Sequence, residues 1–413
     1  MLGFLNAIVS VVGAMVFVVA VSLGMLRNTL VMLCIALREW RNTGKELSPY
    51  TPPVTVLIAA HNEEKSIEAC IRSVLASHYP EFHILIADDG STDTTVSKIQ
   101  TTFAGNSQVY VLSLAHEGKL KALLQGVSYI QTEFVIALDS DTTVDPETIG
   151  ELMKKLAPAN VAAVAGNIAV RNRTEKIATY QALGYMASNA DRRALDLFGC
   201  VSVVPGAIGA WRKDDYVHAL GDANIAGDVE LTFRALRGGK QVRFAERARA
   251  HTDVPSDTAS VISQRKRWSA EKWQFVKRHG KNLMRESTSF KDLIAGLHVV
   301  SVQALLPLVM WWADIFIVFR IAQAVLTRSV AGTALLGTVK LYIAFLLMEF
   351  LRDALAVHLE KPGDKSLLKV FPVQSVWNRQ LHGLATVLGL LSLPKGVESQ
   401  WNHAERQSPT SSE

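Results

Sequence analysis

Residues 2–26, LGFLNAIVSVVGAMVFVVAVSLGML, contain no charged side chain and are long enough to cross a bilayer as one helix. A cleaved signal peptide needs a basic start and a small-residue cleavage site. The stretch has neither, so we expect a retained anchor. A second apolar run at 30–37 either continues this helix or forms a short helix of its own. Arg38, Arg41 and Lys45 follow, and the positive-inside rule predicts that this end faces the cytoplasm.

The composition indicates a soluble part joined to membrane spans. The chain has 413 residues, 49% of them hydrophobic, and a mean hydropathy of +0.18. Juxtamembrane cations partly explain the net charge of +5, and cations and aromatic residues form no extended stripe, so nucleic-acid binding is not expected. Cys34, Cys70 and Cys200 lie far apart without CxxC spacing, which gives no metal or disulfide signal and favours a reduced, cytosolic compartment.

Residues 54–250 show the alternating pattern of an α/β domain. Apolar, β-branched runs bounded by turn residues predict strands at 54–60, 82–90, 109–114, 134–141 and 161–166. Helical patterns alternate with these runs, for example at 63–77 and 94–104. Such alternation predicts a mostly parallel sheet with helices on both faces, and ligands then bind beyond the carboxyl ends of the strands.

The last third of the chain returns to a membrane-like composition. Apolar stretches at 293–324, 331–357 and 371–393 are each long enough to span. They are interrupted by Arg320, Lys340, Glu349, Arg352 and Asp353. The segment 285–300 is expected to begin as an interfacial amphipathic helix. Four spans in all would put the C-terminus on the side opposite the α/β domain, whereas five spans or a re-entrant segment would return it.

Two pairs of carboxylates follow predicted strands. ADDGST carries Asp88 and Asp89, and ALDSDTTVDP carries Asp139 and Asp141. Asp, Gly and Ser are also what ordinary turns select, so each group alone is ambiguous. Asp139 and Asp141 stand two residues apart, so both can reach one hard cation. Mg²⁺ and Mn²⁺ favour carboxylate oxygens and usually share their shell with substrate phosphates.

Three weaker signals accompany these pairs. HEGKLKAL places Lys119 and Lys121 after a glycine, where a lysine can meet a phosphate or simply begin a solvated helix. VVPGAIGAWRKD (203–214) is either a glycine-rich loop that lets backbone approach a ligand or an ordinary turn. AGDVELTFRAL places Asp228 just before an amphipathic helix, as a helix cap or as a general base facing an acceptor hydroxyl.

The segment SQRKRWSAEKW supplies the most specific motif, Gln264-x-x-Arg267-Trp268, downstream of the pattern DVELT that begins at Asp228. In its order of DDGS, DSD, a glycine-rich loop, DVELT, QRKRW and apolar segments, the chain resembles the processive family 2 inverting glycosyltransferases. These are the synthases of poly-N-acetylglucosamine, hyaluronan, chitin and cellulose. The resemblance covers residues 50–400, and by size, by AVAGNIAVRNR and by SLPKG it is greatest to bacterial poly-β-1,6-N-acetylglucosamine synthases.

This resemblance implies a GT-A fold that binds a UDP-sugar donor with Mg²⁺ or Mn²⁺ as cofactor. Carried over by motif, Asp89 with Asp88 beside it would contact the nucleoside. Asp141, with Asp139 nearby, would hold the divalent cation on the diphosphate. Lys119 is a further candidate for the substrate phosphates, and Asp139 is also a candidate substrate-binding residue.

The resemblance also assigns the acceptor side of the site. Asp228 would be the catalytic base, Gln264 and Arg267 would steady the pyrophosphate, and Trp268 would line the acceptor sugar site. The residue types suit inversion at an anomeric carbon. One positioned carboxylate takes the proton of the incoming hydroxyl, a cation and an arginine stabilise the departing UDP, and a flat indole packs on a sugar ring.

Three positions depart from the family pattern. Gly227 stands where an acidic residue usually precedes the base, His61 replaces the aromatic ring of Pro-x-Tyr-Asn-Glu, and Leu124 stands where close relatives often have Asn. These changes are typical of a divergent branch with another sugar or linkage. The sequence does not identify the sugar, and UDP-N-acetylglucosamine is favoured only by overall likeness.

The predicted organisation has four parts. They are an N-terminal transmembrane anchor at 1–46, a cytosolic GT-A domain at 47–284, an interfacial helix and C-terminal transmembrane helices at 285–400, and a polar tail at 401–413. We expect a multi-pass protein of the inner (plasma) membrane whose partners are the UDP-sugar, the growing polysaccharide and the bilayer. A small membrane or export partner subunit is left open.

Three functions compete at this point. The first is a processive synthase that polymerises and exports a polysaccharide. The second is a non-processive membrane glycosyltransferase that adds one sugar to a lipid acceptor, because some lipid glucosyltransferases also carry a Q/R-x-x-R-W signature. The third is a membrane binding or transport protein with a degenerate nucleotide fold. Retention of Asp89, Asp141, Asp228 and the Gln264-x-x-Arg267-Trp268 motif argues against the third.

Overall fold

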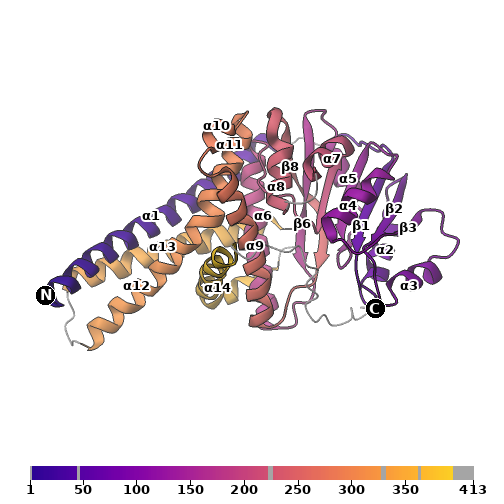
Figure 1. Ribbon diagram of the computed structural model, residues 1–413. Coiled ribbons are helices and arrows are strands. Elements are labelled where there is room, and N and C mark those ends of the chain that lie inside the picture. Colours follow the sequence, from indigo (N-terminus) through magenta and orange to yellow (C-terminus); the bar gives the residue numbers. More distant parts are fainter. Residues whose placement is uncertain (1, 44–46, 222–226, 327–331, 361–363, 394–413) are drawn as a thin grey trace.

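The computed structural model describes residues 2–43, 47–221, 227–326, 332–360 and 364–393, with side chains described from residue 11 in the first range and from residue 335 in the fourth. Figure 1 shows a layered α/β domain beside three long helices that extend away from it. The predicted tail at 401–413 lies outside the described residues, as do Lys45 and residues 222–226 just before Asp228.

An eight-stranded sheet forms the centre of the α/β domain, in the order β3-β2-β1-β4-β7-β6-β8-β5. Its strands are β1 (Val54–Ala60), β2 (Phe82–Asp88), β3 (Val109–Ser113), β4 (Phe134–Asp139), β5 (Thr143–Val144), β6 (Val161–Val170), β7 (Ile208–Arg212) and β8 (Gln241–Thr252). Strands β1 to β4 are parallel to one another, and β6 is parallel to β8. Strands β7 and β5 run antiparallel to their neighbours. The carboxyl ends of β1, β2 and β4 therefore meet at one edge, as the sequence predicts.

Helices cover both faces of this sheet. They are α2 (Ile67–Leu75), α3 (Thr95–Thr102) and α5 (Thr148–Leu156) on one face, and α4 (Lys119–Ser128), α7 (Lys213–Leu220) and α8 (Asp228–Leu236) on the other. Val56 and Ile58 of β1 pack on the first face, and Leu57 and Ala59 pack on the second. Because successive strand side chains alternate between faces and both faces are covered, β1 reads as a continuous apolar run.

The five strands expected from the sequence are present, but two long segments of the sheet were not anticipated. Strand β7 lies inside the stretch 203–214, for which the sequence predicts a loop or turn, and β8 carries four charged side chains in twelve residues. β8 is nevertheless a strand because its buried positions include Val242, Phe244 and Ala250, while most of its charged side chains lie at partly exposed positions. It pairs with β6 along most of its length.

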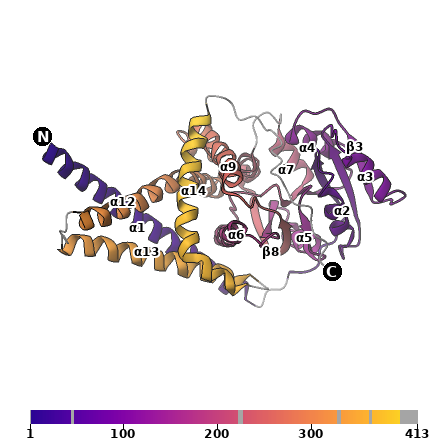
Figure 2. The same ribbon diagram turned by 90° about the horizontal axis from the view of Figure 1, so that it is seen from below.

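Three helices extend side by side away from the α/β domain: α1 (Leu2–Asn42), α12 (Leu306–Leu326) and α13 (Gly332–Leu359) (Figures 1 and 2). The apolar run at 30–37 continues α1 without a break. Within the described residues, two segments are long and apolar enough to cross a membrane, Val11–Asn42 and Phe290–Leu326. Their outward side chains are largely apolar, with Met15 64% and Val318 66% exposed, and such a surface suits contact with lipid.

The second of these segments begins earlier than expected. Ser289 and Asp292 form a capping box at the start of α11 (Phe290–Leu297), which continues through the π-helical segment η2 (His298–Leu305) into α12. Only the short α10 (Leu283–Glu286) precedes the cap within the described part of 285–300. A π-helical segment in a long helix is often found at a functional site.

Of the charged residues that interrupt the apolar stretch 331–357, Lys340 is exposed, whereas Glu349, Arg352 and Asp353 point into the protein. Arg379 of α14 pairs with Asp314 of α12 at 3.0 Å and also with Glu349 of α13. Arg352 pairs with Asp353 at 2.6 Å and donates to the side-chain oxygen of Asn28 at 3.1 Å. Intramembrane charges are expected to face the interior of a bundle and to pair, and these do.

Helix α14 (Phe371–Ser392) differs from the other three in direction and burial. It crosses them in Figure 2 and packs against both α12 and α9 (Thr258–His279). A Cβ built on Gly389 would lie 2.8 Å from the backbone nitrogen of Ala270, and the indole N–H of Trp273 donates to the Thr386 carbonyl at 3.1 Å. The helix that carries the QRKRW motif is therefore fixed against α14.

Candidate active site

Four elements of the α/β domain converge on one point. They are the carboxyl end of β4, the loop before β7, and the first turns of α4 and α8. Lys119, at the start of α4, forms an ion pair with Asp139 at the end of β4. A Cβ built on Gly206 would lie 3.2 Å from Lys119 Nζ, 3.4 Å from a carboxylate oxygen of Asp139 and 3.5 Å from one of Asp228. Gly206 thus lies at the centre of a compact group of one cation and two carboxylates. Sequence reasoning read its loop only as glycine-rich.

Asp228 does not cap its own helix. It is the first residue of α8, and its side chain makes no capping bond there; instead, Oδ2 accepts a hydrogen bond from the backbone N–H of Gly206 at 2.8 Å. Burial raises the pKa of this carboxyl, and the Asp139 carboxylate adds to the rise, while Lys119, the Gly206 N–H and Arg267 oppose it. Burial also acts on Lys119, but the surrounding Asp139 and Asp228 carboxylates hold the pKa of its ammonium above the ordinary value.

One face of α9 presents the predicted motif to the same point. Gln264, Arg267 and Glu271 lie three and four residues apart, which places them on one side of a helix, and Trp268 flanks them. The Arg267 guanidinium lies 3.5 Å from a carboxylate oxygen of Glu271. The side-chain oxygen of Gln264 is buried and accepts no hydrogen bond from the described residues. It is therefore available to a ligand.

Glu271 is a site residue that sequence reasoning missed. A Cβ on Gly227 would lie 2.5 Å from Glu271 Oε2, so the side chain of Glu271 needs a glycine beside the candidate base. Burial raises the pKa of Glu271 to about 7, and the neighbouring charge of Asp228 contributes to the rise. The helical spacing from Arg267 was the signal that could have found it.

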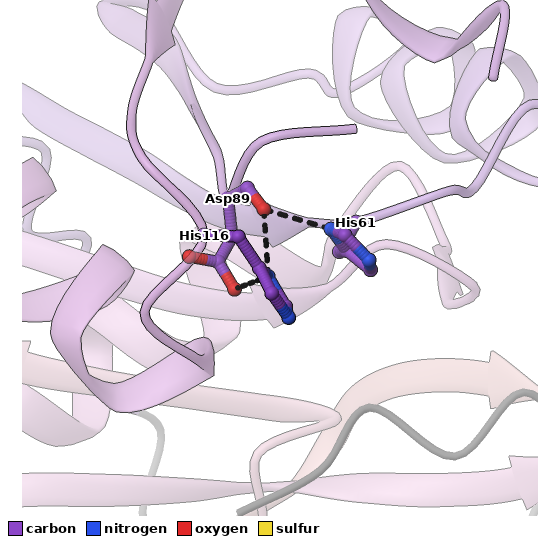
Figure 3. Close-up of side chains that lie close together, drawn as sticks. All are labelled: His61, Asp89 and His116. Atoms are coloured by element: carbon purple, nitrogen blue, oxygen red, sulfur yellow. Dashed lines mark hydrogen bonds and ion pairs between the residues drawn. The ribbon is translucent and has the colours of Figure 1, made fainter. Parts of the chain in front are cut away.

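The first pair of carboxylates has a different environment (Figure 3). Asp89 is fully buried; its carboxylate accepts the backbone N–H groups of Glu117 and Gly118 at 2.8 and 2.9 Å and contacts the His116 ring at 2.9 Å. The His61 and His116 rings stack with centroids 4.2 Å apart, and each ring contacts the Asp89 carbonyl through Nδ1. Asp89 thus organises the loop that leads into α4.

Asp88 is almost fully buried beside Asp89. One of its oxygens accepts the Ser91 N–H at 3.2 Å, and the other accepts no hydrogen bond from the described residues. Gly90 adopts a positive φ of 66°, and a Cβ there would lie 3.0 Å from the His116 backbone nitrogen, so the turn requires glycine. Together these contacts fix the end of β2 against the His116 loop.

A single cavity of about 1850 Å³ joins the converging side chains to the long helices. On the side of the α/β domain it is lined by Lys119, Asp139, Asp141, Asp228, Gln264, Arg267, Trp268 and Glu271. On the other side it is lined by residues of the long helices, including Arg27 and Asn28 of α1, Met310 of α12, and Glu349 and Arg352 of α13. Asp88, Asp89 and Lys121 do not line it. The structure therefore brings seven of the nine predicted site residues around one space.

Two groups of side chains suit a metal ion. Asp139 and Asp141 follow β4, line the cavity and offer the carboxylate oxygens that Mg²⁺ and Mn²⁺ prefer. A second group, His61, Asp89 and His116, has one ligand atom from each residue within 4.8 Å of the others. There the Nδ1 atoms and the carboxylate already engage in the hydrogen bonds described above. Asp139 also pairs with Lys119, but Asp139 and Asp141 supply two carboxylates that line the cavity, so this pair is the better fit for a hard cation.

Comparison with known proteins agrees with this architecture. Residues 55–215 match the family model of glycosyl transferase family 2. The chain is 27% identical over 220 residues to poly-β-1,6-N-acetyl-D-glucosamine synthase of Staphylococcus aureus strain COL, a match over 52% of this chain and 53% of the relative. It is 25% identical over 224 residues to the synthase of Staphylococcus epidermidis. The chain spans about half the length of these curated relatives.

A solved structure shows the same fold. The mannosyltransferase PcManGT of Pyrobaculum calidifontis superposes with a TM-score of 0.58 at 19% identity, over 90% of this chain and 98% of that one. The likeness establishes the GT-A architecture expected from the sequence. Asp228 and the QRKRW motif lie beyond the matched range 55–215. The chain thus has a GT-A fold, matches the model of glycosyl transferase family 2 over residues 55–215, is similar to poly-β-1,6-N-acetylglucosamine synthases, and includes helices that are apolar enough to span a membrane.

Proposed function

We propose that the protein is a membrane-embedded, processive glycosyltransferase that polymerises a polysaccharide from a UDP-sugar with inversion and couples synthesis to export. UDP-N-acetylglucosamine is the donor we propose, because the curated relatives are poly-β-1,6-N-acetyl-D-glucosamine synthases. The observation that carries the proposal is the cavity, which connects Asp139 and Asp228 with polar side chains of the long helices, such as Asn28 and Glu349. A growing chain needs such a continuous polar path.

The donor half of the site is assigned to the ends of β2 and β4. The stacked His61 and His116 rings, ordered by Asp89, offer a flat surface near the end of β2 where a nucleobase would lie, and the second oxygen of Asp88 is an available acceptor. Asp139 and Asp141 would hold Mg²⁺ or Mn²⁺; the solved neighbour was obtained with GDP-mannose and Mn²⁺. Such an ion neutralises charge on the diphosphate when bound.

Proton transfer is assigned to Asp228. Its carboxylate is buried and has one oxygen fixed by the Gly206 N–H, so the other oxygen can accept a proton from an acceptor hydroxyl in the cavity. A raised pKa makes it a stronger base than an exposed aspartate while Lys119 nearby favours its charged form. Arg267 and Lys119 supply positive charge where the leaving diphosphate develops negative charge.

The acceptor half is assigned to α9. Trp268 lines the cavity and presents an indole surface on which a sugar ring can pack. Beyond it, the cavity reaches α1, η2 and α13, where Asn28, Gln303 and Glu349 offer hydrogen-bonding groups. A sugar polymer carries hydroxyls that need such partners away from water.

Sugar incorporation in proteoliposomes tests the proposal. The purified full chain is supplied separately with radiolabelled UDP-N-acetylglucosamine, UDP-glucose or UDP-galactose and Mg²⁺ or Mn²⁺, and the products are sized. We expect a metal-dependent ladder of high mass from one donor. Asp228→Asn should abolish it, because an amide cannot take the hydroxyl proton.

Other products would point elsewhere. A single sugar on a lipid would replace the proposal by a non-processive lipid glycosyltransferase. Transfer that survives Asp228→Asn unchanged would remove that residue from the role of base. Retention of UDP binding in the variant, measured by calorimetry, is the control that separates lost chemistry from lost folding.

A further inference from the structure

Glu271 lies between two charged groups to which the proposed reaction gives different tasks. Its oxygen Oε1 lies 3.5 Å from the guanidinium of Arg267, which is one turn earlier on the same helix, α9. Its other oxygen, Oε2, occupies the space beside Gly227, where a Cβ would lie only 2.5 Å away. Gly227 directly precedes Asp228, the first residue of α8. One carboxylate therefore stands between the cation assigned to the leaving diphosphate and the carboxylate assigned to the proton.

Two carboxylates compete for the Arg267 guanidinium. Burial raises the pKa of Asp228, while the positive charges of Lys119 and Arg267 oppose the rise, so Arg267 is near enough to act on the candidate base. Within the described residues, Arg267 nevertheless forms its ion pair with Glu271 and none with Asp228. An arginine side chain has several rotatable bonds, so it can turn toward whichever carboxylate attracts it more strongly. Glu271 thus competes with Asp228 for this cation.

An ion pair between Arg267 and Asp228 would harm both of their proposed tasks. The arginine would favour the charged form of Asp228 and so make it a weaker base. Its guanidinium would also be drawn away from the diphosphate, where negative charge grows during transfer. Glu271 follows Arg267 by four residues, a spacing at which an ion pair holds the guanidinium along its own helix.

A charged Glu271 costs stability at this position. Burial, followed by the charge of Asp228, raises the pKa of Glu271 to about 7. At pH 8 the carboxyl is therefore ionised in surroundings that favour its neutral form. Glutamine has nearly the same shape and carries no charge, so it would fill the site without this cost. A charged group that is retained at a cost in stability points to a task in the reaction rather than in folding.

We propose that Glu271 is a positioning residue that holds Arg267 away from Asp228 and so keeps the leaving-group cation and the base apart. The proposal rests on the proposed function for the tasks of Arg267 and Asp228, but not on the identity of the sugar or on processivity. Glu271 itself takes no part in making or breaking a bond. The arrangement needs glycine at position 227, because any side chain there would occupy the place of the Glu271 carboxylate.

Calorimetric titration of the full chain with UDP and Mn²⁺ at pH 8 tests the proposal without requiring transfer. Glu271→Gln should weaken UDP binding about tenfold, the loss expected when one charge-assisted hydrogen bond is withdrawn. Adding Asp228→Asn to that variant should reverse most of the loss, because an amide no longer attracts the Arg267 guanidinium. If Glu271 only supported the fold, Asp228→Asn would not restore UDP binding.

Two further variants and a stability measurement complete the test. Glu68→Gln removes the carboxylate of a comparable pair, with Arg72 at 2.9 Å on α2 outside the cavity, and should bind UDP as the parent does. Gly227→Glu/Glu271→Ala returns a carboxylate to the same volume and should bind UDP within about threefold of the parent. Thermal unfolding at pH 8 should show Glu271→Gln to be at least as stable as the parent, which separates weaker binding from lost folding.

The outcomes separate this proposal from the proposed function. The positioning role is overturned if Glu271→Gln binds UDP as tightly as the parent, or if Asp228→Asn leaves the loss in Glu271→Gln unchanged. A proteoliposome assay in which the parent makes no polymer would overturn the proposed function and leave these binding results readable. Conversely, polymer synthesis by Glu271→Gln at the rate of the parent would overturn the positioning role and leave the proposed function standing.

Discussion

The carboxylate of Glu271 occupies the volume that a side chain at Gly227 would fill, since a Cβ there would lie 2.5 Å from Oε2 of Glu271. The resemblance described in the sequence implies an acidic residue at the position of Gly227. Here a carboxylate reaches the same place from α9 instead, beside Arg267 and next to the candidate base. The glycine at position 227 is thus matched by a carboxylate from a residue forty-four positions later in the chain, and we expect substitutions at the two positions to affect each other.

Gly227→Ala should lower transfer by about tenfold or more, because the new methyl group displaces the Glu271 carboxylate and, through it, Arg267. The backbone φ of Gly227 is −104°, so alanine adds no backbone strain. The measurement is kcat and KM for the donor. The double variant Gly227→Ala/Glu271→Ala should bind UDP as well as Glu271→Ala alone, because without the Glu271 carboxylate the new methyl group at position 227 has nothing to displace. Equal rates for Gly227→Ala and the parent would contradict the pairing.

Glu271→Gln should change how stability depends on pH. The pKa of Glu271 is raised from 4.5 to about 7, so the folded protein holds a proton that the unfolded chain releases between these values, and stability falls as pH rises through that window. Asp228, Arg267, Lys272 and Lys119 are the charged groups that face it. Glutamine carries no charge, so it removes the free-energy cost of keeping an ionised carboxylate buried at this position. The variant should therefore be more stable than the parent at pH 8 by roughly 1–2 kcal/mol.

Thermal unfolding at pH 5 and pH 8 checks this sign. The stability advantage of Glu271→Gln should be present at pH 8 and should shrink toward zero near pH 5, where the native glutamate is protonated in the folded state. A matched variant at an exposed glutamate, Glu133→Gln, should show no such dependence, because its side chain is 69% exposed. An advantage that is equal at both pH values would show that titration of Glu271 is not its cause.

Gly206→Ala should impair transfer while leaving the fold intact. The added methyl would lie 3.2 Å from Lys119 Nζ, closer than such contacts normally come, whereas its distances of 3.4 and 3.5 Å to carboxylate oxygens of Asp139 and Asp228 are ordinary contacts. Lys119 must then shift by a few tenths of an ångström, which we expect to lower kcat about tenfold. Gly150→Ala is a suitable control, because a Cβ there would meet no atom within 4 Å. Comparable kcat values for the two variants would contradict the role given to this contact.

The sequence predicted where the ends of the strands meet better than it predicted the contacts of the individual side chains there. Alternation of apolar runs placed the ends of β2 and β4 together, because parallel strands in a covered sheet leave few alternatives for where their ends lie. The sequence did not reveal that the Asp89 carboxylate accepts hydrogen bonds from the backbone N–H groups of Glu117 and Gly118. Such bonds depend on the path of a loop, which no local pattern specifies. Nor did it reveal Glu271, which a motif ending at Trp268 leaves out.

The apolar C-terminal third shows a different limit of prediction from sequence. The pattern located the helices, but their direction depends on contacts that no local pattern contains. α14 crosses the other three because Gly383 and Gly389 allow close approach to Trp311 and to α9 (Figure 2). Likewise, no local pattern reveals that Glu349 and Arg352 of α13 find partners on α14 and α1.

Chelation should abolish transfer, and Asp141→Asn should raise the metal concentration needed to restore it. Asp139 and Asp141 are the carboxylates of the cavity best suited to a hard cation, and loss of one anionic ligand weakens such sites. The measurement is the Mn²⁺ concentration at half-maximal UDP binding after treatment with EDTA, expected to rise at least tenfold. Asp145→Asn is the control, because Asp145 follows the same strand end but pairs with His251 at 2.8 Å. Metal-independent UDP binding by the parent would contradict the assignment.

Arg38→Gln should destabilise the junction between α1 and the α/β domain. Arg38 is 2% exposed and pairs with Asp196 and Glu246, each at 2.7 Å. Removing one partner of a buried ion pair leaves uncompensated charge and typically costs about 3–5 kcal/mol; here Arg243 still pairs with Asp196, so we expect the lower end of that range. Arg41→Gln, on the exposed side of the same helix, should cost less than about 0.5 kcal/mol. Thermal unfolding in detergent compares the two, and equal midpoints would show that Arg38 does not hold the helix to the domain.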